Sequence, residues 1–274
     1  MIREIQSVHR GLATSDGAGV NLTRIIGHGK MPDLDPFLLL DEFRSDDSSD
    51  YMAGFPEHPH RGFETLTYMV EGKFEHKDSY GHHGILGSGG AQRMTAGKGI
   101  RHSEMPLMEN GLCHGYQLWI NLPSKEKMKE PSYKDHPVET FPVIEQNGVK
   151  LTLLAGTYDN HTGPVITHQP IFYGDLMFYN NSSICIPVSA DWNAMIYVVD
   201  GILSAGSQNK EFTKNDLIIL SAGDEVQING HANSRCLLIA GLPVNEPVAR
   251  GGPFVMNTEM EIRQAFLDYQ KGVF

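Results

Sequence analysis

Four side chains with metal-binding chemistry lie in two short motifs. The first motif, His58-Pro59-His60, places two imidazoles at positions i and i+2, and the second places His102 and Glu104 at the same spacing. Side chains at i and i+2 of an extended strand point to one face of the sheet, so each pair can reach one point in space. Three imidazole nitrogens and one carboxylate oxygen suit a borderline first-row divalent metal better than calcium, magnesium or a thiolate-seeking metal. We therefore expect a mononuclear metal site with the ligands His58, His60, His102 and Glu104.

One neighbouring carboxylate competes for the fourth position. Glu64 lies four residues after His60 and shares the strand parity of both histidines of the first motif. As an alternative it accepts a hydrogen bond from a ligand imidazole, and we expect it to lie outside the coordination shell. Arg61 has the opposite parity, so it is expected to point away from the metal and to form a structural ion pair.

Other polar side chains near the motifs have less specific signals. A turn-rich segment holds His76, His82 and His83, for which we expect a position at the pocket rim or in solvent rather than ligation. Gln117 alternates with Trp119 along an expected strand. It therefore either faces the pocket and hydrogen-bonds a ligand or forms a plain part of the barrel wall.

The elements expected to position these motifs are mostly short β-strands. The 29 glycines and 15 prolines are scattered between short apolar runs, which is typical of many strands joined by tight turns. Residues 36–44 form a nearly continuous apolar run, which favours a strand buried on both faces, with a short buried helix as the alternative. A helix is expected near the C-terminus, where Thr258 and Glu261 form a capping box and Gly272 provides a stop.

An internal repeat indicates two copies of one unit. Residues 68–72 (YMVEG) resemble residues 197–201 (YVVDG), and residues 95–97 (TAG) resemble residues 221–223 (SAG), at offsets of 129 and 126 residues. Two fused β-barrels explain both matches, and chance similarity is the alternative. In the second copy the positions equivalent to the two motifs hold no imidazole or carboxylate: Pro187, Ser189, Ile228 and Gly230. One metal, in the N-terminal half, is therefore expected.

The segment between residues 121 and 137 is polar, and Pro123 and Pro131 bracket a short solvated part of it, so it is the expected linker. This places an N-terminal β-barrel with the metal site at residues 1–130. A C-terminal barrel without metal ligands, together with the C-terminal helix, is placed at residues 131–274.

Composition narrows the partners and the compartment. The chain has 22 basic and 33 acidic residues, a net charge of −11, which argues against nucleic-acid binding and against adsorption to anionic membranes. Its three cysteines are widely spaced and are expected to be reduced thiols. No signal peptide and no apolar run long enough to cross a bilayer are apparent. We therefore expect a cytoplasmic protein.

The motifs resemble the pirin family of bicupins. The resemblance runs nearly end to end and is carried by residues 58–65, 94–106, 115–122 and 252–258. It implies an all-β fold of two tandem cupin barrels with a short C-terminal helix. It also implies one divalent metal, Fe(II), with zinc, manganese, nickel, cobalt and copper as alternatives, and the family pattern places the ligands on the same four residues.

The resemblance also implies an activity. Several family members resemble quercetin 2,3-dioxygenases, which open a flavonol ring with O2 and release carbon monoxide. In this hypothesis the 3-hydroxyl of the flavonol loses its proton to Glu104, which would be both a metal ligand and the catalytic base. Residues 90–93 (GAQR) depart from the family pattern, which usually has an aspartate and later an aromatic here, and Arg93 is expected to alter the barrel rim or substrate access.

Two other functions stay open. Animal pirins are described as nuclear, redox-sensing transcription co-regulators, which implies a metal-binding regulatory protein that modulates a protein partner without turnover. The other alternative is a cupin enzyme that consumes an oxidisable aromatic other than quercetin.

Overall fold

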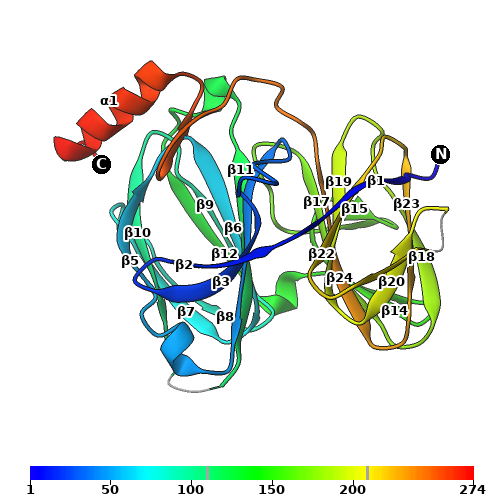
Figure 1. Cartoon of the computed structure of the whole chain (residues 1–274). Helices are drawn as coiled ribbons and strands as arrows, with labels where there is room; N and C mark the ends of the chain where they lie inside the picture. Colours follow the sequence, from blue (N-terminus) through cyan, green and yellow to red (C-terminus); the bar gives the residue numbers. More distant parts are fainter. Residues whose placement is uncertain (109–110, 208–209) are drawn as a thin grey trace. The chain divides into compact units, whose positions relative to one another are not determined.

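Strands dominate the structure, as expected from the turn-rich sequence. The computed structural model describes residues 1–108, 111–207 and 210–274 (Figure 1). Across these three ranges the only α-helix is α1 (Glu259–Gln270), and 3-10 turns lie at Ser48–Asp50, Ser124–Glu126 and Val138–Thr140. No helix in the described chain is long and apolar enough to cross a membrane. The all-β prediction with a C-terminal helix is confirmed.

The chain forms two compact units that exchange their terminal segments. The N-terminal barrel comprises residues Leu12–Val138 and Val244–Phe274, and the C-terminal barrel comprises Met1–Gly11 and Glu139–Pro243. The units therefore differ from the expected division at residue 130. The C-terminal helix belongs to the N-terminal barrel, and the first strand of the chain belongs to the C-terminal barrel.

The N-terminal barrel consists of two sheets. The seven-stranded sheet has the order β12 (Ser132–His136), β9 (Ala91–Thr95), β6 (Phe63–Glu71), β11 (Cys113–Asn121), β4 (Phe37–Ser45), β3 (Val20–Ile26) and β2 (Leu12–Asp16). The four-stranded sheet has the order β5 (Phe55–His60), β10 (Ile100–Pro106), β7 (Lys73–Asp78) and β8 (His83–Gly87). The apolar run of residues 36–44 is therefore the buried strand β4, not a helix.

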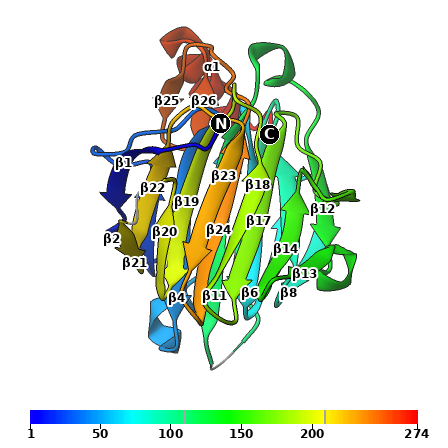
Figure 2. The ribbon, with the colours of Figure 1, turned by 90° about the vertical axis from the view of Figure 1, so that its right-hand side faces the viewer.

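The C-terminal barrel repeats this arrangement. Its seven-stranded sheet, which Figure 2 shows face-on, has the order β1 (Ile5–Arg10), β22 (Asp216–Leu220), β19 (Asn193–Asp200), β24 (Ser234–Gly241), β17 (Ile171–Phe178), β14 (Val149–Ala155) and β13 (Val143–Gln146). Its four-stranded sheet has the order β18 (Ser182–Pro187), β23 (Glu225–Gly230), β20 (Ile202–Ala205) and β21 (Glu211–Thr213).

Each unit also has a short hairpin. In the C-terminal unit β15 (Thr157–Tyr158) pairs with β16 (His161–Thr162), and in the N-terminal unit β25 (Ala249–Gly251) pairs with β26 (Phe254–Met256).

The matching strand orders confirm the internal repeat. The first pair of repeat segments, residues 68–72 and 197–201, lies on β6 and β19, each of which is the third strand of its sheet. Each strand is followed by a glycine with positive φ, Gly72 at +110° and Gly201 at +79°. Part of the expected linker is a strand, because β12 pairs with β9 at the edge of the N-terminal sheet. In the C-terminal sheet β1 holds the equivalent edge position, beside β22.

The two barrels are filled differently. The interior of the C-terminal barrel is one large apolar cluster, to which β18 and β23 contribute Ile184, Ile186, Val226 and Ile228. The equivalent strands of the N-terminal barrel, β5 and β10, direct histidines and a glutamate inward, beside an apolar cluster that includes Phe43, Phe74 and Leu86. Burying these polar side chains costs free energy unless they are hydrogen-bonded or bind an ion, so the N-terminal barrel is the one that holds the candidate functional site.

Helix α1 follows the expected caps. Thr258 accepts a hydrogen bond from the backbone N–H of Glu261, whose side chain accepts one from the N–H of Thr258, so the capping box is present. Ile262 and Ala265 are the buried residues of the helix and pack in a cluster with Phe254 of β26. The helix, red in Figure 1, belongs to the same compact unit as the N-terminal barrel, and its Asp268 forms an ion pair with Arg61 of that barrel.

Candidate metal centre

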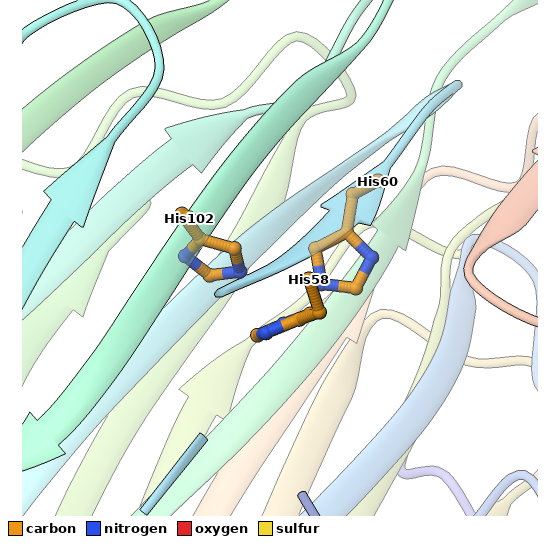
Figure 3. Close-up of side chains that lie close together, drawn as sticks. All are labelled: His58, His60 and His102. Carbon is orange, nitrogen blue, oxygen red and sulfur yellow. The ribbon is translucent and has the colours of Figure 1, made fainter. Parts of the chain in front are cut away.

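Three histidines converge inside the N-terminal barrel. β5 and β10 run antiparallel, with His102 opposite His58 and Ile100 opposite His60. The ring centroids are 4.6 Å apart for His58 and His60, 4.4 Å for His58 and His102, and 5.1 Å for His60 and His102. One ligand atom of each ring lies within 4.8 Å of the other two (Figure 3). The structure thus brings together the three imidazoles that strand parity placed on one face.

Local sequence explains why β5 can hold the first motif, His58-Pro59-His60. β5 is the edge strand of its sheet, where Pro56 and Pro59 can be accommodated although they lack an N–H for the ladder. Gly62, with φ +88°, turns the chain into β6, and a Cβ atom there would lie 1.9 Å from the carbonyl oxygen of Val255. Only glycine permits both this turn and the close approach of the C-terminal segment.

The hydrogen bonds of the three rings leave one nitrogen of each for a ligand. His58 Nδ1 lies 2.8 Å from the carbonyl oxygen of Pro56, and His60 Nδ1 lies 3.3 Å from that of Pro253. A carbonyl oxygen only accepts, so both Nδ1 atoms carry the hydrogen and both Nε2 atoms keep a lone pair. His102 Nε2 is buried and has no hydrogen-bond partner among the described residues. Such a donor set fits a divalent metal ion.

Burial keeps two of these rings neutral. Desolvation, together with the charge of His58, lowers the pKa of His60 well below its usual value. Desolvation and the neighbouring His60, His58 and His76 do the same to the pKa of His102. Neutral imidazole is the form that coordinates a metal. At neutral pH these two rings can therefore bind a metal ion without first losing a proton.

Glu104 is held beside this group by three donors. Its Oε1 accepts hydrogen bonds from Gln92 Nε2 at 2.6 Å and Thr67 Oγ1 at 3.1 Å, and its Oε2 accepts one from Gln117 Nε2 at 2.7 Å. The group whose ligand atoms lie within 4.8 Å of one another comprises the three histidines without Glu104. Its role as the fourth ligand stays a prediction.

Two charged side chains beside the histidines have partners of their own. Glu64 Oε1 accepts hydrogen bonds from Arg93 Nη1 at 3.0 Å and Thr95 Oγ1 at 2.8 Å, and Glu64 is not in the histidine group. Arg61 forms an ion pair of 2.8 Å with Asp268 of helix α1. The ion pair expected for Arg61 is therefore present, and the place of Glu64 outside the coordination shell stays a prediction.

One expectation was wrong, and one residue was missed. His76 is not at the rim: it is 1 % exposed and its Nδ1 lies 3.4 Å from His102 Nδ1. His82 is half-buried and His83 exposed, as expected. Gln92, within the segment that departs from the family pattern, holds Glu104, and strand alternation alone gave no sign of that partner.

A cavity of about 660 Å³ opens onto two of the histidines. Trp119 forms part of its wall, stacked on Phe63 with ring centroids 4.2 Å apart and edge-on to His60 at 5.1 Å. Gln117 also lines the cavity, and its Oε1 accepts a hydrogen bond from Trp119 Nε1. It therefore faces the pocket, and a hydrogen bond from it to a ligand stays a prediction. The remaining lining is mixed, and includes Leu39, Phe43, Phe55, Arg24 and Asp41.

Lys127 ties the C-terminal segment to the site. Its buried ammonium group donates to the carbonyl oxygens of Gly62 and Val255, at 2.8 and 3.1 Å, and to Asn121 Oδ1 at 2.7 Å. Burial lowers the pKa of Lys127 to about 8. This contact holds the turn after β5 against the segment whose Pro253 carbonyl accepts from His60.

Lys127 predicts a pH dependence of stability. Its pKa is about 8 in the folded protein and 10.5 when unperturbed, so between these values the unfolded state binds more protons and stability rises with pH. Relative to Lys127→Met, the wild type should gain about 2 kcal/mol between pH 8 and 10. Urea unfolding at both pH values measures this. In Lys129→Met, which removes an exposed lysine, the free energy of unfolding should change with pH as in the wild type. A difference in this free energy between the wild type and Lys127→Met that is the same at both pH values would contradict the prediction.

Comparison with known proteins now gives the family. A family model described as Pirin matches residues 19–120, and one described as Pirin C-terminal cupin domain matches residues 173–274. The chain is 42 % identical over 276 residues to a pirin-like protein of Caulobacter vibrioides, covering 100 % of this chain and 99 % of that one. It is 43 % identical over 279 residues to a Pseudomonas aeruginosa protein whose name provisionally assigns quercetin 2,3-dioxygenase activity, covering 99 % and 98 % of the two chains.

Solved structures agree. A quercetin 2,3-dioxygenase of Acinetobacter baumannii superposes with a TM-score of 0.92 at 31 % identity, over 100 % of this chain and 99 % of that one. A bacterial pirin of Escherichia coli in complex with nickel(II) shares the fold, with a TM-score of 0.69 at 22 % identity over 86 % of this chain and 99 % of that one. The expected tandem cupin barrels are confirmed, and the chain belongs to the pirin family.

Proposed function

We propose that this protein is a metal-dependent dioxygenase that opens the ring of quercetin-like flavonols with O2. The observation that carries the proposal is a set of three imidazoles with lone pairs free for an ion, two of which line a cavity large enough for a small aromatic molecule. The names of the Pseudomonas and Acinetobacter relatives support the reaction. Three free cysteines agree with a reducing compartment, so a cytoplasmic location is part of the proposal.

The metal is proposed to be iron, as Fe(II). His58, His60 and His102 would hold it, and Glu104 would be the fourth ligand. When bound, a divalent metal supplies Lewis acidity and a place where O2 and an anionic substrate oxygen can meet. Nickel occupies a more distant relative of the same fold, so the identity of the ion is a question for metal analysis.

Residues of the chain then position the substrate and its proton. Trp119 and Phe43 offer aromatic and apolar surface to a flat ring system. Glu104 is the proposed base, accepting the proton of the flavonol 3-hydroxyl at a carboxylate oxygen. Its orientation is fixed from the cavity wall, because Trp119 Nε1 donates to Gln117 Oε1 and Gln117 Nε2 donates to Glu104 Oε2.

Metal content and O2 uptake test this proposal together. Protein purified without chelators should contain one equivalent of iron per chain, consume O2 when quercetin is added and release carbon monoxide. Both gas exchanges should stop after the metal is removed and should return when Fe(II) is restored. One equivalent of metal with no O2 uptake would contradict the dioxygenase proposal. It would favour the alternative, a redox-sensing regulatory protein whose metal state changes its binding to a protein partner.

A further inference from the structure

His76 lies directly behind one ligand of the candidate metal centre. β7 pairs with β10 so that His76 is opposite Glu104 and Asp78 is opposite His102. The rings of His76 and His102 have centroids 5.2 Å apart, and His76 also stacks on Tyr133 with centroids 4.1 Å apart at 18°. The His76 ring is therefore fixed in position, on a different strand from the ligands.

Asp78 begins a hydrogen-bond chain with one direction. Its side chain is 0 % exposed; Oδ1 accepts from the backbone N–H groups of Tyr80 and His82, at 2.9 and 3.0 Å, and Oδ2 accepts from His82 Nδ1 at 2.8 Å. His76 Nε2 lies 3.3 Å from the same Oδ2. An ionised carboxylate only accepts, so His76 Nε2 carries the hydrogen and, in the neutral ring, Nδ1 keeps the lone pair.

The chain continues into the metal centre. His76 Nδ1 lies 3.4 Å from His102 Nδ1, and because it has only a lone pair to offer, His102 Nδ1 must carry the hydrogen between them. His102 Nε2 is then the lone-pair nitrogen, and it is the buried atom without a hydrogen-bond partner in the described chain. Asp78 thus decides, through one intervening ring, which nitrogen of His102 is available to a metal.

The other two ligands reach the same state by other means. His58 and His60 donate from Nδ1 to backbone carbonyl oxygens, which no side-chain substitution removes. Within the histidine group, His102 is the member whose Nδ1 contacts another side chain. We propose that Asp78 and His76 are positioning residues that hold His102 as the Nδ1–H tautomer, so that Nε2 faces the metal. This inference rests on the proposed metal site.

Imidazole ¹⁵N chemical shifts of the chelator-treated protein test the tautomer without metal or activity. Wild-type His102 should show a protonated Nδ1 and an unprotonated Nε2. In His76→Phe, which keeps the aromatic ring and loses the acceptor, both His102 nitrogens should shift toward averaged values. In His76→Asn an amide oxygen replaces Nδ1 as the acceptor, so the wild-type pattern should largely return. Asp78→Asn can donate to His76 and reverse the chain, which should favour Nε2–H on His102.

Ni(II) titration calorimetry supplies the second readout. Affinity should fall about ten- to a hundredfold in His76→Phe and Asp78→Asn, as for partners that orient other metal-bound histidines, and should recover in His76→Asn. His82→Ala is the matched control, because it removes another hydrogen bond to Asp78 without touching His102, and it should stay within about twofold of the wild type. Thermal midpoints of all variants show whether each folds; if His76→Phe does not, Asp78→Asn carries the test.

The outcomes separate this inference from the function proposed above. An Nε2–H tautomer in the wild type, or unchanged shifts and Ni(II) affinity in His76→Phe and Asp78→Asn, would overturn it. Metal binding without O2 uptake would overturn the dioxygenase proposal and leave the positioning role intact. If the wild type bound no Ni(II), the role toward a metal would be overturned, even where the ¹⁵N shifts follow the expected pattern.

Discussion

Replacing His60 with asparagine should weaken binding of a divalent metal ion by about a hundredfold. The asparagine amide can still donate to the Pro253 carbonyl oxygen, as His60 Nδ1 does, but it offers no nitrogen in place of Nε2. If four ligands share an apparent binding free energy of about 10–16 kcal/mol, each accounts for roughly 3 kcal/mol, which corresponds to about two powers of ten in affinity. O2 uptake with quercetin should be lost together with the metal.

Calorimetric titration with Ni(II), and metal analysis after purification, measure this loss. His83→Asn is the matched control, because His83 is exposed and pairs with Glu75 at the surface of β8. Its metal content should equal that of the wild type. Retention of one tightly bound metal equivalent by His60→Asn would mean that the ion is held elsewhere.

Replacing Glu104 with glutamine should separate metal binding from turnover. The side-chain oxygen of glutamine can still face an ion, so affinity should change by less than about tenfold, whereas a neutral amide cannot accept the substrate proton. Losing a positioned base costs about 10²- to 10⁴-fold in rate. The surrounding donors Gln92 and Gln117 keep the replaced side chain in place, provided that one of their amides turns to accept its new N–H.

The rate of quercetin-dependent O2 uptake at equal metal loading is the measurement. Glu75→Gln serves as the control, since it removes a carboxylate from the outer part of β7 and should turn over like the wild type. Full activity in Glu104→Gln would remove Glu104 from the role of base. A metal-free Glu104→Gln variant would instead show that the carboxylate charge is needed to hold the ion.

Strand parity and the repeat account for most of what could be predicted. Along β10 the buried positions alternate through Ile100, His102 and Glu104, so the inward direction of the second motif follows from local sequence. The repeated glycines after β6 and β19 mark one turn in two copies of a fold, which local sequence also records. The capping box at Thr258 is another local signal, and it begins the helix where expected.

What could not be predicted depends on pairings between distant strands. The burial of His76 follows from β7 lying beside β10, whereas its own neighbourhood is polar and turn-rich and resembles a surface loop. The exchange of terminal segments has the same cause. β1 pairs with β22 about 210 residues later, and no short-range pattern in either strand predicts this pairing.

The exchange of terminal segments constrains the order in which the site can form during synthesis. Residues 12–138, with all three histidines, leave the ribosome before the strands of the C-terminal barrel that follow β1, yet the Pro253 carbonyl that orients His60 comes after those strands. Domains commonly fold as they emerge, but this barrel lacks Val244–Phe274 until the other barrel has been synthesised. A nascent chain halted before Pro253 would therefore expose the histidines without the fixed His60, and selective metal loading is expected only after that segment has docked.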